Sequence, residues 1–268
     1  MKFILLTILI ILGCVGTGIV AGFTARHYYV NIKRYQCILI GVGVVVIEFG
    51  ICFLSFIMSD YDAEREAYNY LNDSDTVDVS KEDYGYFFDG DGEKDAIIFY
   101  PGANVEIEAY APLMYMLAEE GIDAFLISMP LKLPLFGKNK GEEIINKYSY
   151  ESYYMAGHSL GGTMAAKFAA SNNKVNGVIF LASYSTVKLN DSLKVLSMYG
   201  TRDRVMSMND YNQNVGNFPK SYKEVVIEGG NHAGFGMYKN QRGDGDSKIT
   251  TLTQIECTKE EIVALIRN

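Results

Sequence analysis

Apolar and polar residues follow two different patterns along the chain. Residues 3–23 form an uncharged apolar run of 21 positions, and residues 37–58 form a second run of 22 positions that Glu48 alone interrupts. Each run is long enough to cross about 30 Å of hydrocarbon as a helix. A cleaved signal peptide is the alternative for the first run, but its apolar stretch would be unusually long. We therefore predict a transmembrane hairpin of two helices over residues 1–58.

Charges beside the two runs predict how the hairpin lies in a membrane. The connecting loop, residues 24–36, carries Arg26, Lys33 and Arg34, whereas residues 59–62 are acidic. Basic loops tend to remain in the cytoplasm. We expect a two-pass protein of the cell membrane that contacts the lipid bilayer through residues 3–23 and 37–58. Its large domain is then extracytoplasmic; a signal-like first helix would place it in the cytoplasm instead.

Polar and small residues inside the runs indicate how the helices pack. Glu48 is either a proton or ion site or a neutral carboxyl bonded within the hairpin, for example to Thr17. We favour the neutral carboxyl because neither run holds a second ionisable residue. Gly18 and Gly22 form a face of small residues that would pack the two helices together or dimerise the chain.

From residue 59 the pattern changes to short apolar segments separated by amphipathic ones. Residues 59–75 are polar and read as a juxtamembrane linker, and the alternation over 76–90 predicts an edge hairpin. Short apolar strands are predicted at 96–100, 124–129, 153–156, 177–182, 195–199 and 224–227, with helices at 107–120, 160–171 and 259–266. This alternation predicts an α/β domain over residues 76–268, with a mostly parallel sheet and helices on both faces.

Charge and cysteine content exclude several classes of function. Residues 59–268 hold 20 of the 24 basic and 31 of the 32 acidic residues, a net charge of −11. Such a domain is not expected to bind nucleic acid or to dock on anionic lipid through its charge. Three of the four cysteines lie in the apolar runs, and no ligand spacing typical of a metal site occurs. We expect neither a metal nor another cofactor.

One motif indicates nucleophilic chemistry. Residues 157–161 read Gly-His-Ser-Leu-Gly, between the strand predicted at 153–156 and the helix predicted at 160–171. A serine on such a strand-to-helix turn is held in a strained conformation at the positive end of the helix. A glycine-rich turn before an ordinary helix is the alternative. In this context we predict that Ser159 is a nucleophile.

Two further residues follow later strands and complete a set for acyl transfer. His27 belongs to the apolar hairpin and His158 lies within the turn, so His232, in a glycine-rich loop after 224–227, is the candidate base. Asp203 follows the strand at 195–199 and would fix the tautomer of the imidazole, with Asp210 as the alternative. The loops at the carboxyl ends of parallel strands meet at one edge of the sheet.

The oxyanion that forms in acyl transfer needs two backbone donors. We expect one from Leu160, the residue after the nucleophile, and the other from Ala103, in the Pro-Gly-Ala-Asn loop after the strand at 96–100. Glu106 and Glu108 begin the next helix, where we expect them to favour the helix dipole rather than to contact substrate.

Taken together these segments resemble the α/β-hydrolase superfamily, and more narrowly a bacterial alpha/beta hydrolase family with a short lidless core. The matching segments are residues 100–102, 106–113, 129–131, 157–162, 199–203, 228–236 and 241–245. The resemblance implies an α/β-hydrolase fold and a serine hydrolase with Ser159, Asp203 and His232 as its triad. It does not extend to the apolar hairpin.

The expected function is a membrane-anchored serine hydrolase that cleaves a carboxylic ester or related acyl bond through an acyl-enzyme. A peptidase or thioesterase with the same triad, and a tethered binding protein without activity, are the alternatives. Only about ten residues separate the strand at 177–182 from the next, so no lid domain is expected. Residues 131, 133, 135 and 136 are apolar and would line a wall of the site. Small or envelope-associated acyl compounds are the expected substrates.

Overall fold

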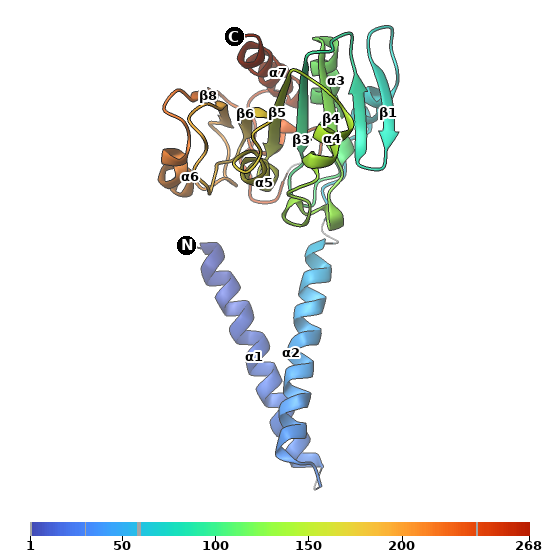
Figure 1. Cartoon of the computed structure of the whole chain (residues 1–268). Coiled ribbons are helices and arrows are strands. Elements are labelled where there is room, and N and C mark those ends of the chain that lie inside the picture. The colour runs from blue at the N-terminus through green and yellow to red at the C-terminus, as the bar shows by residue number, and fades with distance from the viewer. Residues whose placement is uncertain (1, 30, 58–59, 240) are drawn as a thin grey trace. The chain divides into compact units, whose positions relative to one another are not determined.

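The computed structural model describes residues 2–29, 31–57, 60–239 and 241–268, and the side chains of the first helix from residue 11 onward. Figure 1 shows the elements. The chain divides into two compact units, residues 1–59 and 60–268. The second unit therefore includes the segment that the sequence suggested as a linker.

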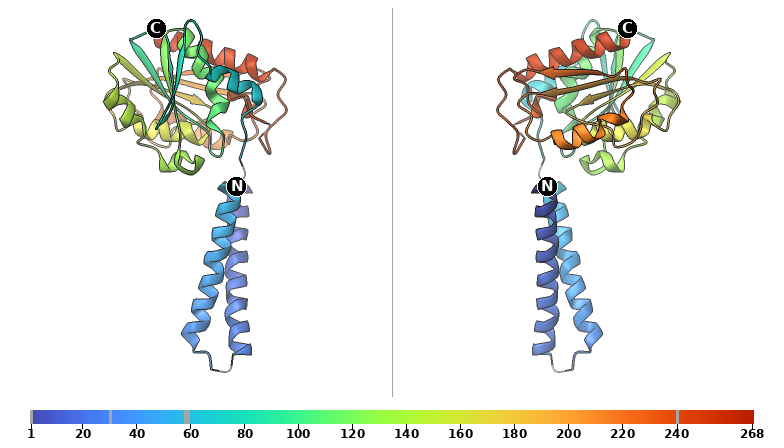
Figure 2. Two further views of the ribbon diagram at one scale, coloured as in Figure 1. Left: turned by 90° about the vertical axis from the view of Figure 1, so that its right-hand side faces the viewer. Right: turned by 90° about the vertical axis from the view of Figure 1, so that its left-hand side faces the viewer.

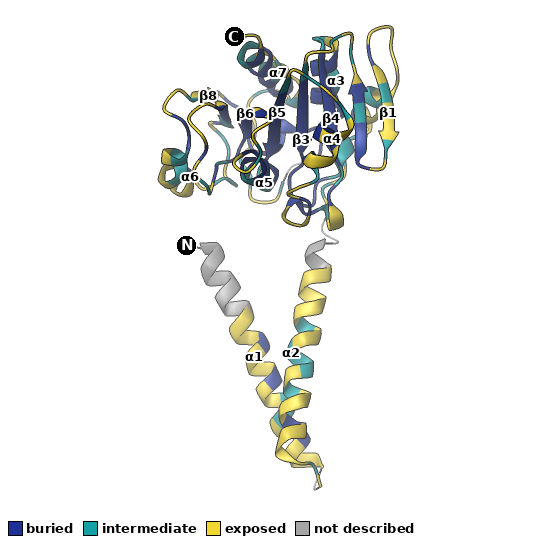
Figure 3. Cartoon of the chain, viewed as in Figure 1, coloured by how far each residue is buried: buried dark blue, intermediate teal, exposed yellow. Residues whose placement is uncertain are grey.

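The first unit is a pair of helices, α1 (Lys2–Tyr28) and α2 (Arg34–Ile57). They approach closely where glycines face each other. A Cβ atom on Gly18 would lie 2.7 Å from the carbonyl oxygen of Gly41, and one on Gly22 would lie 2.8 Å from that of Cys37. The small face predicted from Gly18 and Gly22 thus packs α1 on α2. Most other described side chains of this unit are exposed (Figure 3).

A polar contact joins the two helices at mid-length. The hydroxyl of Thr17 lies 2.7 Å from Oε2 of Glu48 and 2.8 Å from the carbonyl oxygen of Cys14. A hydroxyl has a single proton, so Thr17 donates only one of these two bonds at a time. The predicted bond between Glu48 and Thr17 is present.

Membrane crossing is supported for one helix rather than two. Among the described residues, Arg34–Leu54 is the one segment long and apolar enough to span a bilayer. The other predicted span, residues 3–23, includes side chains 3–10, which lie outside the described residues.

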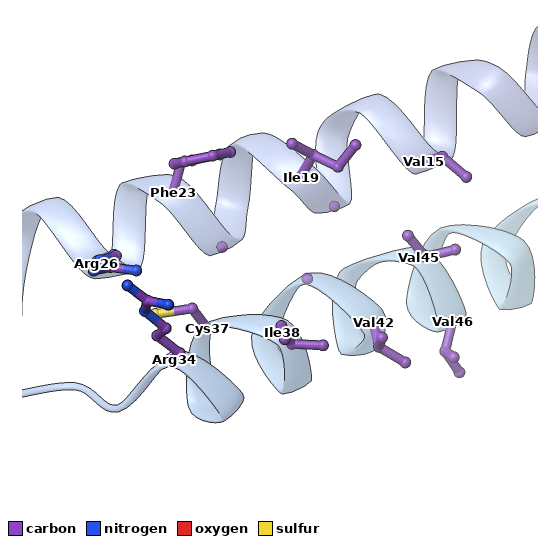
Figure 4. A pocket seen from close by; sticks show the side chains of 13 residues that line it. Val15, Ile19, Phe23, Arg26, Arg34, Cys37, Ile38, Val42, Val45 and Val46 are labelled. Atoms are coloured by element: carbon purple, nitrogen blue, oxygen red, sulfur yellow. The ribbon is translucent and has the colours of Figure 1, made fainter.

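An apolar groove of about 590 Å³ runs between α1 and α2 (Figure 4). Val15, Ile19 and Phe23 line it from α1, and Arg26 and Arg34 stand at its loop end.

The second unit contains an eight-stranded sheet in the order β1-β2-β4-β3-β5-β6-β7-β8. The strands are β1 (Asp78–Glu82), β2 (Gly85–Asp89), β3 (Asp95–Tyr100), β4 (Ile122–Ile127), β5 (Ser152–His158), β6 (Val175–Leu181), β7 (Lys194–Gly200) and β8 (Lys223–Ile227). Strands β1 and β2 pair antiparallel and β2 pairs antiparallel with β4, while the pairs from β4 to β8 are parallel. The mostly parallel sheet and the edge hairpin predicted from the sequence are confirmed.

Helices cover both faces of this sheet (Figure 2). On one face, α3 (Ala111–Glu119) and α7 (Thr251–Arg267) pack in one cluster of buried apolar residues. On the other, α4 (Gly141–Lys147), α5 (Leu160–Ala169) and α6 (Met208–Asn214) contribute to a second cluster. Strands buried on both faces need apolar residues at successive positions, and β4 is buried at all six.

Helix α7 begins eight residues earlier than the sequence suggested. Its first eight residues contain three threonines, which have low helix propensity. The cap explains the earlier start: the hydroxyl of Thr250 accepts a hydrogen bond from the amide of Thr253 at 3.1 Å. Burial of Ile255 against the sheet then outweighs propensity.

The first residues of the second unit form a strap across the ends of the sheet, which we define as residues 60–64. The amide of Tyr61 donates to the carbonyl of Asn104 at 2.8 Å, and the amide of Glu106 donates to the carbonyl of Tyr61 at 3.0 Å. The amide of Glu64 donates to the carbonyl of Met237 at 2.9 Å. The short helix η1 (Arg65–Leu71) follows, with Ala67 buried.

Candidate active site

The turn between β5 and α5 holds Ser159 in a strained backbone conformation. Ser159 has φ 53° and ψ −123°, a conformation that non-glycine residues rarely adopt. Its amide donates to the carbonyl of Leu181 at 2.9 Å, and its carbonyl accepts from the hydroxyl of Ser183 at 2.6 Å. These bonds to the end of β6 and to the loop that follows it hold the turn in shape, and Ser159 remains partly exposed.

The motif glycines allow the backbone to approach itself closely. A Cβ atom on Gly157 would lie 2.5 Å from the backbone nitrogen of Gly162, and one on Gly161 would lie 2.3 Å from the carbonyl oxygen of Pro101. Any larger residue would push α5 away from β5 or from the loop after β3. The G-x-S-x-G spacing therefore has a steric cause in this structure.

The imidazole of His232 contacts the carboxylate of Asp203. Nδ1 of His232 lies 2.9 Å from Oδ2 of Asp203, and the two side chains are 1% and 3% exposed. The other oxygen of Asp203 accepts from the amides of Val205 and Met206 at 2.8 and 2.9 Å. These bonds aim the carboxylate, so that Nδ1 of His232 carries the proton and Nε2 is left with a lone pair.

Asp210, the alternative acid, lies elsewhere. It is in the first turn of α6, where its amide donates to the capping hydroxyl of Ser207 at 3.2 Å. Of the two candidate aspartates, Asp203 is the one that meets His232.

Nε2 of His232 is buried, and no described residue hydrogen-bonds to it, Ser159 included. A buried polar atom without a partner costs free energy, so such atoms mark sites where a partner arrives later. In unliganded enzymes the bond between nucleophile and base is often long and tightens with substrate. Ser159 follows His158, whose ring centroid lies 4.6 Å from that of His232.

The loop after β3 offers one amide for an oxyanion. The amide of Gly102 donates to the hydroxyl of Tyr110 at 3.0 Å, and that of Asn104 donates to the carbonyl of Lys132 at 2.9 Å. Between them, the amide of Ala103 has no partner among the described residues. Leu160 begins α5, where the first amides of a helix have no intrahelical acceptor.

A hydrogen-bonded chain connects this loop to the loop of His232. The hydroxyl of Tyr110 lies 2.8 Å from Nδ1 of His158, and Nε2 of His158 lies 3.1 Å from the carbonyl oxygen of His232. A carbonyl can only accept, so Nε2 of His158 carries the ring proton and Nδ1 accepts from Tyr110. The same hydroxyl accepts from Gly102. Each group in this chain therefore has a hydrogen-bond partner. The donors point from Gly102 through Tyr110 and His158 to the carbonyl of His232.

Burial keeps this chain neutral. Burial, and secondly the neighbouring imidazole of His232, hold the pKa of His158 well below its usual value. Burial likewise raises the pKa of the Tyr110 phenol. A neutral imidazole has one donor and one acceptor nitrogen, as the direction of the chain requires.

Comparison with known proteins agrees with this fold. The family model of the alpha/beta hydrolase family matches residues 96–256, which span β3 to α7. The chain belongs to the alpha/beta hydrolase family. No curated protein sequence matches it.

Solved structures show the same fold. Mouse alpha/beta hydrolase domain-containing protein 10 has a TM-score of 0.53 and 13% identity, over 74% of this chain and 97% of the mouse chain. Est1E from Butyrivibrio proteoclasticus has a TM-score of 0.50 and 14% identity, over 72% and 100% of the two chains. At this level of identity the likeness concerns the fold alone.

Some residues that support the site of this hydrolase were not singled out by sequence reasoning. Tyr110 and His158 are described above. Asp244 accepts from the amides of Arg204 and Ala233 at 3.1 and 2.9 Å, and so ties the Asp203 loop to the His232 loop. Gln254 is fully buried and bonds both backbone groups of Asn231. Gln254 could have been noticed in the sequence as a polar residue among the buried positions of α7. Asp244 could not, because its partners lie too far away along the chain to form a recognisable spacing.

Both acidic residues after the oxyanion loop have structural partners. Glu106 accepts from the amide of Ala63 in the strap at 2.9 Å, and Glu108 accepts from the hydroxyl of Tyr86 at 2.8 Å. Each of these carboxylates therefore bonds another part of the fold, which the predicted interaction with the helix dipole did not anticipate.

Proposed function

We propose that the protein is a membrane-anchored serine hydrolase that cleaves a carboxylic ester through an acyl-enzyme. Ser159 attacks the carbonyl, and His232 accepts the hydroxyl proton at Nε2. The amides of Leu160 and Ala103 stabilise the oxyanion. His232 then protonates the leaving alcohol, and water repeats both steps to release the acid.

The observation that carries this proposal is the buried pair of Asp203 and His232 with an unsatisfied Nε2. The carboxylate stabilises the imidazolium that forms when His232 takes a proton. A surface histidine would have water at Nε2. The strained backbone of Ser159, one residue from a ring in contact with His232, supports the choice of nucleophile.

Anchoring rests on the apolar segment Arg34–Leu54 and on the basic loop between α1 and α2. The excess of basic residues in that loop supports a cytoplasmic loop and a hydrolase unit outside the cytoplasm. Substrates are then acyl compounds in or near the cell envelope.

A fluorophosphonate probe tests the reaction, because it labels an activated serine covalently. The full chain should be labelled, and Ser159→Ala should abolish both labelling and turnover of a short ester. Ser171→Ala is the matched control: Ser171 lies just past the far end of α5, and its variant should label as the parent does. Labelling that persists in Ser159→Ala would refute the assignment of the nucleophile.

The same probe, in a form that cannot cross membranes, tests the side. Whole cells that display the unit outside should be labelled without lysis. Labelling only after lysis would place the hydrolase unit in the cytoplasm. No labelling of the purified chain under any condition would favour a binding protein that kept the fold.

A further inference from the structure

The hydrolase unit exposes its large apolar side chains unevenly. Among its described residues, those exposed by more than half are Leu131, Leu135 and Phe136, at 54%, 57% and 54%. All three lie in the loop after β4, which we call the apolar loop and define as residues 130–137. Clustered apolar exposure of this kind marks an interaction surface, whereas scattered single residues do not.

The structure of the apolar loop holds these side chains outward. It consists of two short helical turns, η3 (Pro130–Lys132) and η4 (Pro134–Phe136), with Leu133 buried between them. Leu131 and Lys132 both have φ 54°, which is unfavourable for residues with a Cβ atom. The loop thus accepts backbone strain and still leaves Leu131 in solvent. Of the four apolar residues predicted to line the site, only Leu133 is buried.

The charge around the apolar loop differs from that of the rest of the unit. Residues 128–140 contain Lys132, Lys138 and Lys140 and no acidic residue, although residues 59–268 together carry a net charge of −11. Apolar side chains with flanking lysines are typical of segments that lie in the interface of a bilayer, where lysines meet lipid phosphates.

The chain enters the hydrolase unit at this loop. Asp60 is the first residue of the unit, and its carboxylate pairs with the ammonium of Lys132 at 2.5 Å. Along the sequence, Asp60 comes three positions after Ile57, where the apolar helix α2 ends. A chain that leaves a bilayer at the end of α2 therefore reaches the apolar loop almost at once.

We propose that the apolar loop inserts Leu131, Leu135 and Phe136 into the surface of the bilayer that holds α2. This inference rests on the proposed membrane anchoring. Insertion is driven by burial of the three apolar side chains, and the lysines remain among the headgroups. It does not require the acidic unit as a whole to be attracted to lipid.

Insertion would bring the proposed site to the lipid surface. The carbonyl of Lys132 accepts from the amide of Asn104, the residue after Ala103. The apolar loop is thereby bonded to the proposed oxyanion loop. We infer that the substrate is an ester dissolved in the bilayer, whose acyl chain reaches Ser159 past the apolar loop.

A single tryptophan provides a direct test because the chain contains none. Phe136→Trp, in the full chain reconstituted into vesicles of phosphatidylcholine and phosphatidylglycerol, should emit at shorter wavelength than tryptophan in water. Lipids brominated near the headgroup should quench it. The matched control is Val226→Trp, because Val226 is 45% exposed on the edge strand β8. The tryptophan of this control should emit at the wavelength of tryptophan in water, and the brominated lipids should not quench it.

Each outcome decides the proposal. If the chain floats with the vesicles and Phe136→Trp still behaves like Val226→Trp, the loop stays in water and the proposal is wrong. Labelling of Ser159 by the fluorophosphonate would then leave the proposed function intact. If the chain does not float with the vesicles, both the membrane anchor and this proposal are wrong.

Activity gives an independent readout. The double variant Leu135→Ser, Phe136→Ser should lose far more turnover of an ester dissolved in the vesicles than of a water-soluble short ester. Its turnover of a long-chain ester dissolved in the vesicles should fall about a hundredfold or more, the factor expected from losing two buried apolar side chains. The proposal would be contradicted if turnover of both substrates changed by the same factor relative to the parent.

Discussion

The hydroxyl of Tyr110 lies 2.8 Å from Nδ1 of His158, although 48 positions separate the two residues along the chain. Through this contact the loop after β3 is connected to the loop of His232, because Tyr110 also accepts from Gly102 and His158 donates to His232. The two loops that the proposed mechanism requires are therefore held by one buried chain of hydrogen bonds.

Removing one hydroxyl from this chain should slow turnover more than it weakens binding. Tyr110→Phe leaves the amide of Gly102 and Nδ1 of His158 buried without a partner, at a cost of about 1–3 kcal/mol. A shift of the oxyanion loop should then lower kcat about tenfold to a hundredfold with KM nearly unchanged. Steady-state kinetics on a soluble ester measure both constants.

Tyr100→Phe is the matched control for that experiment. The hydroxyl of Tyr100 is also buried; it donates to the carbonyl of Lys138 and accepts from the amide of Gly141, both at 2.8 Å. Loss of this hydroxyl should lower the thermal unfolding temperature about as much as Tyr110→Phe does and leave kcat unchanged. An equal fall in kcat in both variants would mean that Tyr110 contributes only stability.

Replacing Asp203 should prevent His232 from acting as a base, although the histidine itself remains in place. Asp203→Asn keeps the shape of the side chain but can stabilise the wrong tautomer of His232, and in a related triad this lowers kcat about 10⁴-fold. Asp210→Asn should retain the parent kcat, since Asp210 lies at the start of α6. Reversed effects of the two variants would show that the proposed acid is misassigned.

The strap should influence catalysis although it contains none of the proposed catalytic residues. Glu106→Ala removes the acceptor for the amide of Ala63 and should loosen the strap against the oxyanion loop. We expect kcat to fall about tenfold, since a hydrogen bond to a charged group contributes about 1.5–3 kcal/mol. Glu106→Gln, which keeps an acceptor oxygen, should restore most of the activity.

Glu108→Ala is the control for the strap, because its carboxylate bonds Tyr86 of β2 instead. It should lower the unfolding temperature with little change in kcat. A fall in kcat with Glu108→Ala that matches Glu106→Ala would argue against a specific role of the strap.

Stability should depend on pH through Asp123. Burial raises the pKa of this carboxyl to about 6, while bonds from Tyr150 and from the amide of Gly90 oppose the shift, and Asp89 and Glu93 add to it. The folded protein therefore binds a proton more tightly than the unfolded chain, whose value is 3.8. Stability from this group is fully present below pH 3.8 and is lost as pH rises through about 6.

The loss should amount to about 3 kcal/mol, at 1.36 kcal/mol per unit of pKa. Thermal unfolding of the full chain in detergent between pH 4 and 7 measures it against Asp123→Asn, which cannot ionise. The difference in unfolding temperature between the two proteins should change over this range in favour of the variant at high pH. A constant difference would contradict a raised pKa for Asp123.

Much of the fold could be predicted because its elements are encoded locally. Strands β3 and β4 are short runs of apolar residues, and burial on both faces of a parallel sheet leaves that pattern in the sequence. Helix α7 was predicted too short, since its start depends on a cap at Thr250 and on packing of Ile255. Helix propensity alone accounts for neither the cap nor the packing.

Part of the candidate site could also be predicted from the sequence, for a related reason. Ser159, Asp203 and His232 each follow a strand of one parallel sheet, so their loops were expected at one edge, and Asp203 indeed meets His232. Their roles in catalysis stay a prediction. Tyr110 and His158 were missed because their contact joins a helix start to a strand end, and no spacing reports such a pair.

The amino-acid sequence by itself determined the alternation of strands and helices, the strand-to-helix turn at Ser159 and the apolar helix α2, because each depends on residues close together along the chain. Only the tertiary structure decided that Asp203 rather than Asp210 meets His232, that residues 60–64 strap the oxyanion loop, and that Leu131, Leu135 and Phe136 stay exposed. Such contacts depend on which loops the sheet brings together. A buried polar group must find its partner in space, wherever in the chain that partner lies.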